Sequence, residues 1–149
     1  MNEFFQFERD FVESLRCIPM QVRYKLDTCG VKLKLHHWHN LTADDRQLLV
    51  SALCTTEAQI ASYRDTLRQL VSDRAGETPK DLAIDPDPPW HLPSLPDSVC
   101  QKAAEFDIQL QPEQWQTLTP LQRFALIKLS RSGHENKNFL PAIVEFGLR

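Results

Sequence analysis

The sequence predicts a mainly α-helical protein: a single compact domain, residues 1–149, of several short helices with at most a minimal two-stranded ribbon. Three observations lead to this prediction. Apolar residues recur at helical spacing in several segments. Residues that favour helix starts and ends flank those segments. Two stretches of the chain also resemble each other, which indicates an internal pseudo-duplication. With 42% hydrophobic and 25% charged residues, the composition is that of an ordinary globular protein.

The two similar stretches are residues 15–53 and 92–130, which align without gaps at an offset of 77. Ten aligned positions are identical. The identical pairs are Leu15/Leu92, Pro19/Pro96, Val22/Val99, Lys25/Lys102, Leu33/Leu110, Trp38/Trp115, Leu41/Leu118, Thr42/Thr119, Arg46/Arg123 and Leu49/Leu126. Because two copies are too few for a solenoid, we expect them to form one pseudo-symmetric domain.

A first amphipathic helix is expected over Glu3–Arg16, because apolar residues recur there at spacings of three and four. These residues are Phe4, Phe7, Phe11 and Leu15. Pro19 ends this helix and suits the first turn of the next one, which runs to about Thr28. Gly30 follows, and a glycine there can close the second helix with a left-handed cap.

Two short segments have the alternation of a strand. Apolar and basic residues alternate in Val31–Leu35, and Ile108–Gln111 alternates in the same way in the second copy. We expect these two pieces to pair as the minimal ribbon. Each is followed by a segment predicted to form one helical turn, Trp38–Leu41 and Trp115–Leu118.

The remaining helices are predicted from their caps. Thr42–Leu53 and Thr119–Ser130 each begin with a threonine that can cap the helix start. A longer helix over Thr56–Ala75 is stopped by Gly76, and a final short helix covers Asn138–Phe146. Residues 77–96 hold six of the ten prolines, which indicates an extended connector between the two repeat halves.

Charge and hydropathy exclude some classes of protein. A net charge of −3 argues against a nucleic-acid-binding role. No apolar run reaches the roughly 20 residues that span a bilayer, so no membrane association is expected. The first residues, Met1–Arg9, lack the pattern of a secretory signal, and we therefore expect a cytoplasmic protein with reduced cysteines.

Enzyme signatures are absent from the sequence. There is no glycine-rich phosphate loop, no Gly-x-Ser-x-Gly elbow and no His-Glu-x-x-His helix, so we predict a protein that is not an enzyme and needs no cofactor. An alternative is a small redox or metal-handling module. Its residues would be Cys17, Cys29, His36, His37 and His39. Because the histidines have no counterparts in the second copy, a solvated turn and buried thiols are the preferred interpretation, with no metal site.

One stretch of the sequence has a specific residue pattern that helix formation and packing alone do not explain. It reads Phe7-Glu8-x-Asp10-Phe11-Val12-x-Ser14-Leu15-Arg16-Cys17-Ile18-Pro19-Met20-x-Val22-Arg23-x-Lys25-Leu26-Asp27-x-Cys29-Gly30-Val31-Lys32-Leu33. This pattern resembles the nitrate reductase-associated protein family of cyanobacteria and related phototrophs. The Trp38–Leu41 segment and the terminal Phe139-Leu140-Pro141 are also similar to that family.

The resemblance implies an accessory, non-catalytic role in nitrate assimilation. Proteins of this kind are associated with assimilatory nitrate reductase, and the expected partner is the reductase or its maturation or electron-donor machinery. No catalytic residues are implied. The densest part of the pattern is the expected contact surface, and its residues are Arg16, Cys17, Arg23, Lys25, Asp27 and Cys29. A small-molecule sensor in nitrogen metabolism, with its site between the copies, is a further alternative.

Overall fold

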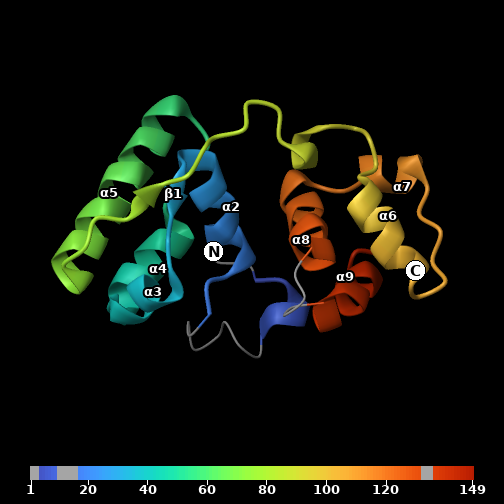
Figure 1. Cartoon of the computed structure of the whole chain (residues 1–149), viewed down its shortest axis with the longest axis horizontal. Helices are drawn as coiled ribbons and strands as arrows, with labels where there is room; N and C mark the ends of the chain where they lie inside the picture. Colours follow the sequence, from blue (N-terminus) through green and yellow to red (C-terminus); the bar gives the residue numbers. More distant parts are fainter. Residues whose placement is uncertain (1–3, 10–16, 132–135) are drawn as a thin grey trace. The chain divides into compact units, whose positions relative to one another are not determined.

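The protein is mainly helical, with a single short ribbon within the part of the chain that the structure describes. The computed structural model describes residues 4–9, 17–131 and 136–149 (Figure 1). These residues group into two compact units. One comprises Glu8–Ile84 with Phe4, and the other comprises Asp85–Arg149 with Phe5–Phe7. The prediction of a single domain stays a prediction, as does the duplication of residues 15–53 in 92–130.

The first unit contains four helices and the ribbon within its described residues. The helices are α2 (Met20–Cys29), α3 (Leu35–Asn40), α4 (Ala43–Ser51) and α5 (Glu57–Ala75). Helix α5 packs against the other three (Figure 1). The core of this unit is formed by apolar residues from all four helices, which include Trp38, Leu49, Leu67, Val22, Leu26, Tyr63 and Val71.

The second unit is built around one apolar helix, α8 (Pro120–Arg131). It packs against α6 (Asp97–Ala104), against α9 (Phe139–Glu145) and against the short turn η2 (Pro89–His91), as Figure 1 shows. The remaining elements are η1 (Gln6–Glu8), α7 (Pro112–Gln116) and η3 (Asn136–Asn138). The side chains buried in this core include Val99, Trp115, Phe124, Leu126, Ile127, Leu129, Phe139 and Ile143.

The predicted caps are confirmed. Thr42 begins α4 by accepting a hydrogen bond from the Asp45 N–H, and Thr119 accepts one from the Gln122 N–H at the start of α8. Thr56, which was not predicted as a cap, begins α5 by accepting a hydrogen bond from the Gln59 N–H. Gly30 and Gly76 end α2 and α5 with left-handed φ angles of 75° and 68°. Glycine adopts this conformation without the steric cost that a side chain would add.

The predicted first helix, Glu3–Arg16, falls mostly outside the described residues. Within Phe4–Arg9 the chain forms the short 3-10 turn η1. The final helix was predicted at Asn138–Phe146 and is found as α9. Helix α6 was not predicted; it begins after Pro96, the position that aligns with Pro19 at the start of α2.

The predicted partner of the first strand was wrong. Strand β1 (Val31–Lys32) pairs antiparallel with β2 (Lys80–Asp81), in the register Val31 opposite Asp81 and Lys32 opposite Lys80. The ribbon continues at Gly30, whose carbonyl oxygen accepts the Leu82 N–H at 2.8 Å. A Cβ atom on Gly30 would lie 2.8 Å from the Leu82 carbonyl oxygen, so glycine permits this approach. The Ile108 N–H is instead used to close α6, by donating to Ala103.

Residues 77–96, the predicted connector, contain β2 and η2. Trp90 is buried and its ring meets that of Phe124 edge to face, with centroids 5.0 Å apart. Leu92 is 41% exposed and does not anchor this segment as Trp90 does. Among the described residues, no helix is long and apolar enough to cross a bilayer.

Candidate functional site

Helix α2 carries most of the predicted contact residues, and a buried carboxylate marks its start. Glu8 is only 2% exposed, and its Oε1 accepts the Met20 N–H at 3.2 Å. A carboxylate is favourable there because the first N–H groups of a helix have no partner within it. Glu8 and Met20 both belong to the distinctive stretch of sequence, so part of that pattern has a structural role.

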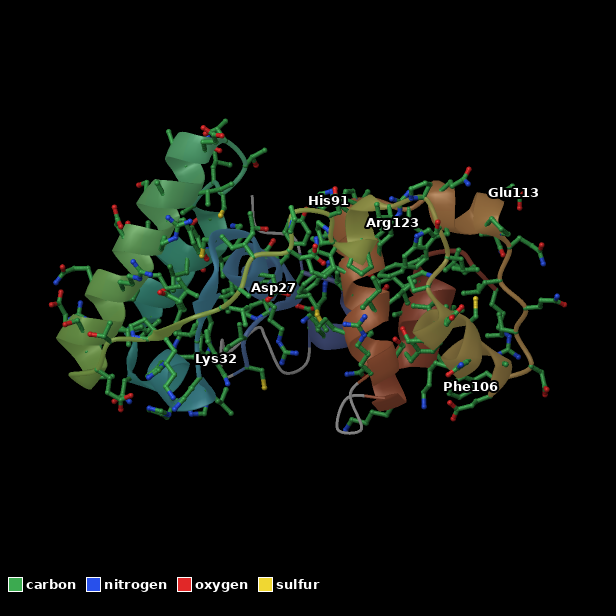
Figure 2. All side chains as sticks on the ribbon, turned by 45° about the horizontal axis from the view of Figure 1, so that its top comes forward. Asp27, Lys32, His91, Phe106, Glu113 and Arg123 are labelled. Carbon is green, nitrogen blue, oxygen red and sulfur yellow. The ribbon has the colours of Figure 1, made fainter. Side chains whose placement is uncertain are left out.

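Arg23 and Asp27 lie four residues apart on α2 and therefore share one side of the helix. Both are half-buried, as is Cys17 just before the helix. The Arg23 Nε donates to the Ile18 carbonyl oxygen at 3.2 Å, which fixes the chain directly after Cys17. Figure 2 shows Asp27 on this helix. Arg16 lies outside the described residues.

Lys25 points elsewhere and has a structural role. Its Nζ donates to the carbonyl oxygens of Val50 and Ala52, each at 2.7 Å, and lies over the Tyr63 ring at 5.6 Å from the centroid. A cation is favourable at these carbonyls because they end α4 and carry its negative partial charge. Burial lowers the pKa of Lys25. The side chain is therefore committed to joining α2 to the end of α4.

Cys29 belongs to the core of the first unit. Its side chain has no exposed surface, and the Sγ–H donates to the Leu26 carbonyl oxygen at 3.8 Å. Burial raises the pKa of the Cys29 thiol to about 11, and burial also raises the pKa values of Cys54 and Cys100. Because the thiolate is the reactive form, these positions disfavour the redox interpretation of Cys29.

Two of the three predicted histidines meet a carboxylate that the sequence analysis did not single out. His36 and His37 lie in the first turn of α3, and Glu77 directly follows the Gly76 cap of α5. The His36 Nε2 lies 3.1 Å from Oε1 of Glu77, and the His37 Nε2 lies 2.9 Å from Oε2. Their hydrogen bonds lower the pKa of Glu77, with that from His37 contributing most.

The tautomer of His37 follows from its second nitrogen. The Lys34 N–H donates to Nδ1 of His37 at 3.1 Å, so Nδ1 carries no proton and Nε2–H donates to Glu77. His37 is 2% exposed, whereas the side chains of His36 and Glu77 are about half exposed, at 51% and 49%. Neither His39 nor any cysteine joins this group within the described ranges.

A hollow lies between α4 and α5 on the first unit. Its lining is mostly apolar and includes Ala52, Ala58 and Tyr63. Two leucines that also line it are exposed, Leu48 at 48% and Leu53 at 67%. Exposed apolar side chains beside a hollow are typical of surfaces that contact another protein.

The chain matches a known protein family. Residues 4–146 match the profile of the family described as conserved nitrate reductase-associated protein. No curated protein and no solved structure matches the chain.

Proposed function

Because the chain belongs to the family of conserved nitrate reductase-associated proteins, we propose that it is a non-catalytic accessory protein of assimilatory nitrate reductase. In this role it acts in the cytoplasm by protein–protein contact and supports the activity, maturation or electron supply of the reductase. The observation that carries the proposal is the family match, which extends over residues 4–146 of 149. A family described by its association with an enzyme favours an accessory role over a catalytic one.

The proposed contact surface is the side of α2 that carries Arg23 and Asp27, together with Arg16 and Cys17 before it. Arg23 and Asp27 offer one charge of each sign, four residues apart, which suits a partner with matching charges. Lys25 and Cys29 serve this surface indirectly. Lys25 bonds α2 to the carbonyl end of α4, and Cys29 packs into the core.

Co-purification from the native cell tests the partner. The tagged protein is expected to enrich nitrate reductase, its maturation proteins or its electron donor, and Arg23→Glu is expected to reduce that enrichment. The exposed Arg131 of the second unit provides the matched control, because Arg131→Glu makes the same charge reversal elsewhere. If the unaltered protein enriches none of these partners, the proposal is wrong.

Loss of the Arg23 bond to Ile18 is a separate effect that the experiment must exclude. Arg23→Lys keeps the positive charge and is therefore expected to keep most of the enrichment, provided that both variants melt at similar temperatures. Leu53→Asp tests the competing surface between α4 and α5, where Leu53 is 67% exposed. If Leu53→Asp abolishes enrichment and Arg23→Glu does not, the contact lies on the α4–α5 surface instead.

The kind of support is a separate question that a deletion strain answers. If the protein acts in maturation or electron supply, the strain is expected to contain reductase protein with little activity. If it protects the reductase from degradation, reductase protein and activity fall together. Unchanged activity in the deletion strain under nitrate-dependent growth contradicts the accessory role.

A further inference from the structure

The two imidazoles and the carboxylate at the start of α3 have the composition of a metal site. One ring nitrogen each of His36 and His37 and a carboxylate oxygen of Glu77 all lie within 4.8 Å of one another. Ligand atoms around a tetrahedral zinc ion are separated by about 3.3 Å, since each lies roughly 2.0–2.1 Å from the metal. Oε2 of Glu77 lies 3.3 Å from the His36 Nε2 and 2.9 Å from the His37 Nε2, so both separations are already close to that value.

The fold holds these ligands on helix α3 and on the residue that follows the cap of α5. Helix α3 packs against α5, and the left-handed Gly76 turns the chain so that Glu77 reaches the first turn of α3. His37 is buried and held in place, whereas His36 and Glu77 are half exposed. A metal ion therefore has access from solvent to a partly preformed site.

We propose that His36, His37 and Glu77 bind one divalent transition-metal ion, with Zn²⁺ as the best match to the donor set. Two histidines and one glutamate suit zinc because imidazole nitrogen and carboxylate oxygen are both ordinary zinc ligands. Three protein ligands leave a fourth position for water or for a group of a bound molecule. The site lies on a different element from the proposed α2 contact surface and does not depend on it.

The tautomer of His37 sets the cost of binding. A metal at Nε2 needs the lone pair there, so the proton of Nε2 must move to Nδ1. Nδ1 then no longer accepts from the Lys34 N–H, and its new proton faces that N–H, so the backbone at Lys34 must shift when the metal binds. Loss of one such hydrogen bond lowers the affinity by about tenfold. His36 bears no comparable cost, because its Nδ1 has no hydrogen-bond partner within the described residues.

Titration of the purified full-length protein with Zn²⁺, followed by calorimetry, tests the stoichiometry. We expect one ion per chain. Both His36→Ala and Glu77→Gln are expected to weaken binding by about tenfold or more, because the first removes a ligand and the second replaces an anionic carboxylate with a neutral amide. These two side chains are half exposed, so their variants should stay folded, whereas a His37 variant opens the core. His39→Ala, an exposed neighbour on the same helix, is the matched control and should bind as the unaltered protein does.

Two further measurements identify the ligands. Co²⁺ is expected to give visible absorption without the sulfur-to-metal band that a cysteine ligand would produce. In an NMR titration the Lys34 amide signal is expected to shift as zinc binds, because its acceptor on His37 is lost. If zinc binds with an unperturbed Lys34 amide, His37 is not a ligand and the three-residue site is wrong. Equal weakening by His39→Ala, or the absence of stoichiometric binding, overturns the proposal as well.

Discussion

Arg123 donates from its Nε to the carbonyl oxygen of Trp115 at 3.1 Å, and its guanidinium lies over the indole ring at 5.8 Å from the centroid. Arg46 makes the same bond to Trp38 at 3.0 Å, with the guanidinium 5.9 Å from that indole. Each arginine also donates to the carbonyl oxygen of the residue that follows the tryptophan, which is His39 for Arg46 and Gln116 for Arg123. The arginine therefore ties the first turns of its own helix to the short helix that carries the tryptophan.

We predict that Arg123→Met destabilises the protein by about 2 kcal/mol, because the change removes the three hydrogen bonds that Arg123 donates to the carbonyl oxygens of Trp115, Gln116 and Trp90. Urea denaturation measures the free energy of unfolding. Arg131→Met, in the last turn of the same helix, is the control and should change it by about 0.5 kcal/mol or less. Equal effects of the two substitutions would show that the Trp115 bond contributes nothing specific.

We predict that substitution by alanine destabilises the protein more at Gly30 than at Gly76. Both have left-handed φ angles, so an alanine costs about 1–2 kcal/mol at either site. At Gly30 the new Cβ would also lie 2.7 Å from the Ile84 Cγ1 and 2.8 Å from the Leu82 carbonyl oxygen, whereas nothing lies within 4 Å at Gly76. Gly30→Ala should therefore lower the melting temperature distinctly more than Gly76→Ala. Equal shifts in melting temperature would mean that the segment at Leu82 and Ile84 moves away from the new Cβ atom without a loss of stability.

Local signals explain why most helices were predictable. A helix cap can be predicted from residues close to it in the sequence. Thr42 bonds to Asp45 three positions later, and Gly76 adopts its left-handed conformation directly after the last residue of α5. The helical turns predicted over Trp38–Leu41 and Trp115–Leu118 are found as α3 and α7, which begin three residues earlier and end at Asn40 and Gln116, and both tryptophans lie in the cores. These predictions succeeded because each depends on contacts within one or two turns of a helix.

Contacts between distant residues were not predictable in this way. Strand β1 has alternation that fits several partners, and its choice of β2 depends on the close approach of Leu82 to Gly30. Lys25 is an ordinary exposed-looking lysine in the sequence, yet it bonds carbonyls 25 and 27 residues later. Glu77 meets His37 across 40 residues for the same reason: tertiary packing, and not local preference, brings them together.

We predict that the thiol of Cys29 reacts slowly with alkylating reagents. Its side chain has no exposed surface, and its pKa is raised to about 11, so at neutral pH it stays protonated and unreactive. Alkylation of the native protein, mapped by mass spectrometry, should modify Cys29 much more slowly than the half-buried Cys17. In denaturant the two should react at similar rates. If Cys29 reacts in the native protein as fast as in denaturant, the redox interpretation must be considered again.

We predict that the contribution of the Asp45 carboxylate to the free energy of unfolding depends on pH. Its carboxylate accepts the Thr42 N–H at 3.0 Å and the Arg74 Nε–H at 2.8 Å, and the Arg74 bond is the main reason that the pKa of Asp45 is lowered. The folded protein thus binds this proton more weakly than the unfolded chain does. Its contribution to stability is complete above the ordinary carboxyl pKa and is lost as the pH falls through the lowered value.

Asp45→Asn is therefore expected to cost about 1 kcal/mol of unfolding free energy at neutral pH, where the charged cap is intact. The difference from the unaltered protein should shrink as the pH falls below the ordinary carboxyl range, because protonation removes the same charge. Urea denaturation at neutral and acid pH measures both values. Asp44→Asn removes an exposed carboxylate from the same turn and controls for the general loss of a negative charge. If the difference between Asp45→Asn and the unaltered protein persists unchanged in acid, the loss of stability comes from altered packing or hydrogen-bond geometry at the substituted asparagine. It does not then come from the loss of the negative charge.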